Sequence, residues 1–403
     1  MELFWLEHKK LWRKKIVKIC VLLCFVYCVI FGSILLFQWF GFGSSDDYTS
    51  AFGNNFDGYT VIKDSQEYAL SFGGELTDET LQKIVSDYQQ MEADGMGEEL
   101  EKTDWQIVNS WLGTLYPELR DTSNYKTMIS YVDPDKLTGF YERRQQVLDE
   151  FLEVSGQVGA EKEFLHQIER KVEKPFHYEW VEGWSTLLGS MVADLGVVMA
   201  LFLGIVLSSL FAGEWHDNTS TLVLTTRNGW GKIALAKILT GLAFTVELFA
   251  LLAVSSVISQ LFFMGTAGWD MPIQNIKLIA VAPMNMLQAE IYEYAFVLLG
   301  AIGFAGIVMF ISAAVKNNVL TLLLSLAVVY GPMMIAEYLP YKMQKALDLI
   351  PLVGSSTDIF RTNTFRIFGK LIWSPYLLIT IPVLIGILCM PFAIKSWSRR
   401  MKA

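Results

Sequence analysis

The stretch FAGEWHDNTSTLVLTTRNGWGKIALAK, residues 211–237, lies as a polar island between two long apolar runs, residues 187–210 and 238–264. Each run exceeds the ~20 apolar residues that a helix needs to cross a bilayer. The island therefore connects two membrane helices on one side of the membrane, and the rest of the chain is arranged around this connection.

Within the island, the pattern of residues predicts a short amphipathic helix. The polar residues 218–220 supply capping side chains ahead of residues 221–224, and Arg227, Lys232 and Lys237 follow on the way back to the membrane. A helix of this kind lies on the membrane surface, where another protein can bind it. An ordinary polar loop with positive anchors fits the periodicity equally well.

The composition predicts an all-α polytopic membrane protein. Of the 403 residues 53% are hydrophobic, and the mean hydropathy is +0.36, which is unusual for a soluble protein. Six transmembrane helices are predicted, at residues 16–40, 187–210, 238–264, 292–315, 320–338 and 372–394. The first segment is too long for a cleaved signal peptide, and no small-residue cleavage site follows it.

The positive charges predict the orientation. They gather before and into the first span, after the last span, in the island and at Lys316 between the fourth and fifth spans. The positive-inside rule assigns all four places to the cytoplasm, and an even number of spans then brings both termini to that side. The exceptions lie between the fifth and sixth spans, which must be outside: Lys342, Lys345, Arg361, Arg366 and Lys370.

Residues 41–180 are predicted to form a separate extracellular domain. They hold 28 acidic against 12 basic residues, a net charge of −16, and no cysteine. About 140 residues are enough to bury a core of their own. Helical spacing from Thr77, from Trp105 to Pro117, and over residues 135–174 with a break at Ser155, predicts a mainly helical domain.

The domain organisation follows from these segments. Residues 1–15 are predicted as a cytoplasmic interfacial helix, residues 16–40 as the first transmembrane helix, and residues 181–403 as transmembrane helices two to six. The last region contains the cytoplasmic segment 211–232 and an extracellular re-entrant segment, residues 339–370. Dipping into the outer leaflet would bring the exceptional basic residues of that segment to lipid headgroups.

Two acidic residues deep within the predicted spans are candidate functional residues, whereas Glu337 is close enough to the surface to be solvated. Glu247 lies near the middle of the third span, and Asp194 lies about a third of the way into the second. A charge at such a depth costs ~3 kcal/mol or more unless it faces protein or water. The functional interpretation is a substrate or ion contact, and the alternative is a protonated or hydrogen-bonded packing residue.

No motif of a metal site or an enzyme is present. Cys20, Cys24 and Cys28 lie on one face of the first span without any histidine or acid nearby, so small packing residues are a better interpretation than metal ligands. The H-E-x-x-H, G-x-S-x-G and G-x-x-x-x-G-K-[ST] patterns are missing. The chain is therefore not predicted to be an enzyme that hydrolyses ATP by itself, and nothing suggests nucleic acid.

The chain resembles the permease subunits of ABC-2 type exporters. The resemblance consists of six spans, a long segment between the second and third, and an F-x-x-E…T-L…T-x-R…K pattern. The matching residues are Phe211, Glu214, Thr221, Leu222, Thr226, Arg227 and Lys237. The common form has Gly-Thr before the leucine and often Pro-Ser before the arginine, from which residues 220–221 and 225–226 depart mildly. The large domain after the first span, with residues 74–81, 140–144 and 174–184, is similar to a Gram-positive branch.

The resemblance implies an exporter in the bacterial cell membrane. Two permease copies, or two homologous permeases, would pair among the membrane lipids, and separate ATPase subunits would bind ATP and Mg, so that this chain needs no cofactor. Residues 211–232 would be the coupling helix, with Leu222 and Leu224 seated in the ATPase beside Thr221, and with Glu214 and Arg227 framing the seat. The segment between the last two spans would be paired outer helices. Substrates in this class include lipids, glycans, peptides and drugs.

A second hypothesis is a membrane sensor or scaffold. It would bind a ligand with its extracellular domain and transport nothing. Such a protein needs a signalling partner, because the chain carries no kinase or DNA-binding domain.

Overall fold

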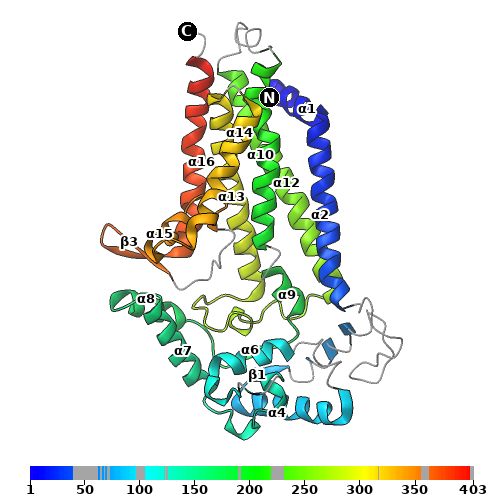
Figure 1. The fold of residues 1–403 in the computed structure, drawn as a ribbon, viewed down its shortest axis with the longest axis vertical. Helices are drawn as coiled ribbons and strands as arrows, with labels where there is room; N and C mark the ends of the chain where they lie inside the picture. Colours follow the sequence, from blue (N-terminus) through cyan, green and yellow to red (C-terminus); the bar gives the residue numbers. More distant parts are fainter. Residues whose placement is uncertain are drawn as a thin grey trace.

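In this computed structural model the described residues are 1–39, 62–63, 66–67, 69, 73–96, 105–121, 123, 126–188, 192–217, 219, 231–315, 317–354 and 363–399. A bundle of long helices carries a smaller helical domain at one end (Figure 1). We call that end of the bundle the domain end. The opposite end, where the N-terminal helix and the last turns of the C-terminal helix lie, is the terminal end.

Five helices of the described residues are long and apolar enough to cross a membrane, which makes this a multi-pass membrane protein by length and composition. They are α10 (Val192–His216), α12 (Lys232–Met264), α13 (Met286–Ala314), α14 (Asn318–Ala336) and α16 (Ser374–Arg399). The predicted first span falls on a further helix, α2 (Lys15–Trp39). Its crossing of the membrane stays a prediction, as does the total of six spans.

Small residues bring α13 and α16 into close contact. A Cβ atom added to Gly303 would lie 2.3 Å from the carbonyl oxygen of Pro382, and one added to Gly306 would lie 2.3 Å from that of Gly386. Only glycine fits at either position, because the backbones themselves touch. This geometry is the usual one for tightly packed membrane helices.

On the other side of the bundle, α2 packs against α12 with the face that carries its three cysteines. Cys20, Cys24 and Cys28 are all buried. The preceding helix, α1 (Glu2–Arg13), turns away from α2 at Lys14, whose backbone is extended, and crosses α12. The three cysteines therefore act as small packing residues.

The inserted domain is closed at its neck by a two-stranded sheet. Strand β1 (Gly74–Leu76) pairs antiparallel with β2 (Phe176–Tyr178), with Gly74 opposite Tyr178. Between them lie α4 (Asp78–Met91), η1 (Glu92–Met96), α6 (Trp105–Leu115), η2 (Pro117–Leu119), η3 (Met128–Ser130), η4 (Pro134–Lys136), α7 (Phe140–Val154) and α8 (Ala160–Glu169). A short helix, α9 (Glu182–Thr186), then leads to α10.

The helical periods predicted for this domain are confirmed. Thr77 caps α4 by accepting a hydrogen bond from the backbone N–H of Thr80, and α6 ends before Pro117. The predicted break at Ser155 separates α7 from α8, and Gly156 there has a φ of 71°. In this part of the chain, capping residues and helix breakers were sufficient to predict where the helices begin and end.

Several boundaries differ from the prediction: α12 begins at Lys232 and α13 at Met286, not at residues 238 and 292. Helix α10 continues to His216, so the first residues of the polar island, including Glu214, belong to a long helix and not to a surface segment. Between α14 and α16 the chain forms α15 (Tyr341–Leu347) and then a β-hairpin of β3 (Thr364–Ile367) and β4 (Lys370–Trp373). The prediction of helical character missed these strands, in which aromatic and β-branched residues surround a Phe-Gly turn.

Candidate functional site

The residues predicted for coupling to a partner lie mostly outside the described residues. Thr221, Leu222, Leu224 and Arg227 all belong to that part of the chain. Glu214 is described, on the last turn of α10 at the terminal end, and only 4% of its surface is exposed. It is therefore the point from which the site is built.

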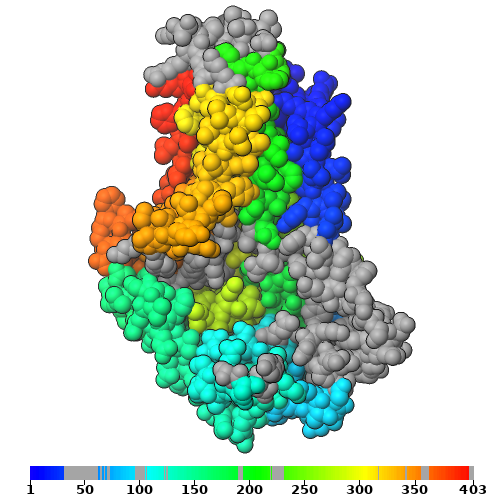
Figure 2. All heavy atoms as spheres, viewed as in Figure 1, coloured from blue at the N-terminus to red at the C-terminus, as the bar shows by residue number. Residues whose placement is uncertain are grey.

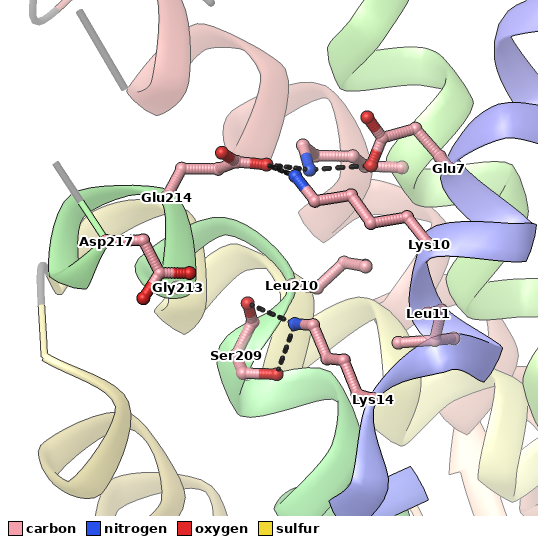
Figure 3. Close-up of a pocket in the computed structure, with 10 residues that line it drawn as sticks. Glu7, Lys10, Leu11, Lys14, Ser209, Leu210, Gly213, Glu214 and Asp217 are labelled. Atoms are coloured by element: carbon pink, nitrogen blue, oxygen red, sulfur yellow. Dashed lines mark hydrogen bonds and ion pairs between the residues drawn. The ribbon is translucent and has the colours of Figure 1, made fainter. Parts of the chain in front are cut away.

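The Glu214 carboxylate binds two lysines from two other helices (Figure 3). Lys237 of α12 donates from Nζ to Oε1 at 2.8 Å, and Lys10 of α1 donates to the same oxygen at 2.5 Å. The other carboxylate oxygen accepts a hydrogen bond from the hydroxyl of Thr219. Lys237, which is 2% exposed, also donates to Oε2 of Glu7 at 2.8 Å.

We call Glu7, Lys10, Glu214 and Lys237 the terminal charge cluster. Its charges alternate along the chain of contacts, and it joins α1, α10 and α12. Removing one partner of a buried ion pair costs about 3–5 kcal/mol, because the remaining charge is left buried and unpaired. The cluster therefore holds the three helix ends together as a unit.

This environment shifts the pKa of Lys10 in α1 and of Lys14, which directly follows the helix. Burial lowers the pKa of Lys10, but the hydrogen bond and the charge of Glu214 outweigh it, so the pKa is raised above its ordinary value. Burial lowers the pKa of Lys14, and the charges of Lys237 and Lys10 lower it further. Lys14 donates to the hydroxyl of Ser209 at 3.0 Å, which fastens the end of α1 to α10.

The space inside the cluster is small. A cavity of about 20 Å³ lies between α1 and α10, lined by Leu11, Gly213 and the charged groups. A single water molecule needs about 10–15 Å³ on this measure. The cavity therefore has no room for a substrate.

Glu247 makes a second contact between α1 and α12. Its Oε1 lies 3.1 Å from Nε2 of His8, and its Oε2 accepts a hydrogen bond from Nε1 of Trp12 at 3.0 Å. The Trp12 ring also lies edge-on to Phe244, with the centroids 6.0 Å apart. The carboxylate is 42% exposed, but both of its oxygens are bound by α1.

Asp194 lies far from this site, at the opposite end of α10. It is half-buried. The structure thus brings Glu214 and Glu247 to one helix, α1, and leaves Asp194 apart. Whether Asp194 or Glu247 contacts a substrate stays a prediction.

Sequence reasoning missed the partners of Glu214 and two further buried acids. In α1, Glu7 and Lys10 are spaced by three residues, which places them on one helix face, and His8 and Trp12 share another. That spacing was a usable signal. Glu290 and Glu293 of α13 are 4% and 6% exposed, and the predicted start of the span at residue 292 concealed Glu290, because the helix begins at Met286.

Among the described residues, no group of three histidine, cysteine or acidic side chains is placed to hold a metal ion.

No family model, no curated protein and no solved structure matches this chain.

Proposed function

We propose that the chain is the membrane-spanning permease subunit of an ATP-driven exporter of the ABC-2 type, located in the bacterial cell membrane. By the positive-inside rule its terminal end faces the cytoplasm and its inserted domain faces outward. A separate ATPase subunit binds ATP and Mg, and two permeases pair to move an amphiphilic substrate outward.

The observation that carries the proposal is the terminal charge cluster. Glu214 lies on α10, which leads into the segment 218–230, and Lys237 lies on α12, which leads out of it. Because they are paired to each other, a force on residues 218–230 moves α10 and α12 together. Their joint contacts with Glu7 and Lys10 extend the motion to α1.

Rigid transmission is what a coupling segment requires. A partner that grips the island through Leu222 and Leu224 can displace the spans only if the island's ends do not yield separately. A flexible loop between unpaired helix ends would absorb the displacement. A sensor or scaffold has no comparable need for a buried charge cluster at this place.

The experiment separates docking from transmission. The protein is purified with its ATPase, and binding and substrate-stimulated ATP hydrolysis are measured. The double variant Leu222→Ala, Leu224→Ala should lose binding, at a cost on the order of a few kcal/mol. Lys237→Gln should keep the ATPase bound and lose the stimulation, because only the cluster is broken.

The matched control is Lys395→Gln, since this exposed lysine lies on α16, outside the island. It should keep both binding and stimulation. Full stimulation in Lys237→Gln would remove the transmitting role of the cluster. Undiminished binding and stimulation in the double leucine variant would leave the island as a connector and favour the sensor.

A further inference from the structure

The β3–β4 hairpin leaves the bundle at the level where a membrane helix begins. Strand β4 ends at Trp373, and α16 starts at the next residue, Ser374. The root of the hairpin therefore lies at the membrane boundary of the domain end. Tyr376, in the first turn of α16, is 62% exposed there, as is usual for aromatic residues at such a boundary.

The hairpin points sideways and not along the bundle axis. It projects beside α15 in Figure 1, and in Figure 2 it forms an orange lobe outside the outline of the bundle. Four residues per strand give it a reach of about 13 Å. A lateral projection of that length from the end of a span runs within the surface layer of the membrane.

The tip of the hairpin carries an apolar side chain without any protein cover. Phe368 is 102% exposed, and it occupies the turn with a φ of 49°, followed by Gly369 with a φ of 79°. Positive φ at both positions is the turn in which asparagine and glycine are relaxed and a bulky residue is strained. Strain of this kind persists where a side chain serves a function.

The two basic side chains beside the tip differ in their contacts with the protein. Arg366 donates to Oε1 of Glu161 in α8 at 2.7 Å, so it faces the inserted domain. Lys370, directly after the turn, is exposed and forms no ion pair with any residue that the structure describes. It pairs with Ile367 across the turn, so an apolar and a cationic side chain flank Phe368.

We infer that this hairpin is a membrane anchor, with Phe368 inserted among the lipids of the leaflet at the domain end and Lys370 on their phosphate groups. Transfer of a phenylalanine side chain out of water is favourable, and a lysine nearby is attracted to anionic headgroups. The anchor holds the strand that carries Arg366 at a fixed depth beneath the inserted domain. The inference depends only on the membrane position of α16 and not on transport.

The test measures the depth of the tip directly. Phe368→Cys and Val154→Cys are made in a background that lacks the native cysteines, labelled with a nitroxide and reconstituted into phospholipid nanodiscs. Val154, in α7 of the inserted domain, is the matched control because it is also apolar and 89% exposed. Collision rates with oxygen, which concentrates in lipid, and with a polar nickel complex are compared.

The ratio of the two rates should be several-fold higher at residue 368 than at residue 154. Equal ratios would place the tip in water and overturn the inference. Spin–spin broadening at residue 368 that disappears on dilution with unlabelled protein would also overturn it, because a second copy of the chain would then cover the tip.

A second pair of variants excludes insertion driven by the label itself. A label at Ile367→Cys is measured with Phe368 intact and with Phe368→Asn, which suits the turn but removes the apolar ring. The oxygen preference at residue 367 should fall severalfold in the asparagine variant. An unchanged preference would show that Phe368 does not hold the hairpin in the membrane.

Discussion

Among the described residues, an arginine–glutamate pair lies at each of two places where the inserted domain meets the rest of the protein. In the first, Arg144 binds Glu169 at 2.6 Å and also donates to the carbonyl oxygens of Leu278 and Ala280, in the loop between α12 and α13. In the second, Arg366 of the hairpin binds Glu161 of α8 at 2.7 Å. The distances are nearly equal.

Burial separates the two contacts. Arg144 and Glu169 are 0% and 3% exposed, whereas Arg366 and Glu161 are 56% and 27% exposed. Water competes for the second pair and screens it, so its worth is about 0–1 kcal/mol, while breaking the first costs about 3–5 kcal/mol. The domain is therefore held by its ion pair more firmly on the α12–α13 loop than at the hairpin, where the buried hydroxyl of Thr364 also donates to Gln157 of the domain at 2.8 Å.

The largest effect is expected from Arg144→Met. The change leaves Glu169 with Lys174 as its one remaining cation among the described residues and takes a hydrogen bond from the carbonyl oxygen of Leu278, so stability should fall by about 3–5 kcal/mol. Thermal unfolding in detergent measures it. Arg170→Gln, on an exposed arginine at the end of α8, is the control and should change little. Similar losses of stability in both variants would show that burial does not determine how much each ion pair contributes to stability.

The next effect concerns the Trp111 indole, which donates to the carbonyl oxygen of Asn275 at 2.8 Å within the same contact. Trp111→Phe keeps an aromatic ring there but leaves that carbonyl unpaired, at a cost of about 1–3 kcal/mol. Hydrogen exchange of residues 273–282 should rise with it. Exchange that stays at the wild-type level would mean that the indole is not what orders the loop.

A smaller effect is expected from acid. Burial raises the pKa of Glu169, but Lys174 and Arg144 lower it more, so that it lies below its ordinary value of 4.5. The stability from this carboxylate is fully present above pH 4.5 and is lost as the pH falls through the folded-state pKa. Unfolding followed across this range should be less steep in pH for Glu169→Gln than for the wild type. Identical slopes would contradict the assignment.

The smallest effect on stability belongs to Glu161→Gln, which removes the exposed pair at a cost of at most about 1 kcal/mol. The variant should instead increase the motion of α8 relative to the hairpin. The distribution of distances between paired spin labels on the two elements should broaden. High salt should broaden the wild-type distribution in the same way, because it screens exposed charges. A narrow distribution in both cases would make the two contacts equally firm.

Contacts at the hairpin also explain a charge pattern that is an exception to the positive-inside rule in the sequence. Basic residues between the last two spans contradict the positive-inside rule, and lipid headgroups were the expected partners. In the structure Arg366 pairs with the acidic domain, and Lys345 donates to the carbonyl oxygen of Thr364 and lies 4.8 Å from the centre of the Phe365 ring. For these two residues, protein contacts replace the expected headgroups.

Local patterns predicted the helices and failed for contacts distant in sequence. Thr77, Pro117 and Ser155 act on their own neighbours, so the ends of α4, α6 and α7 could be read from them. Glu214 was recognised as a polar residue, but its partners lie 204 and 23 residues away along the chain, at Lys10 and Lys237. No periodicity reports such pairings.

The prediction missed the hairpin for a different reason. Its strands are short, and their apolar residues merge with those of α16, so a hydropathy window assigned Ile372 to the last span. The Phe-Gly pair is a weak turn signal, since a phenylalanine in that position is strained. Residues under such functional demands are where local rules are expected to fail.

The paired strands at the neck of the inserted domain carry an evolutionary consequence. Because Gly74 lies opposite Tyr178, the domain enters and leaves the chain at one point, and a single recombination event could exchange it as a unit. The α12–α13 loop opposes this freedom. Its carbonyls at Asn275, Leu278 and Ala280 are satisfied by side chains of the domain, so a replacement domain succeeds only if it arrives with the loop that fits it.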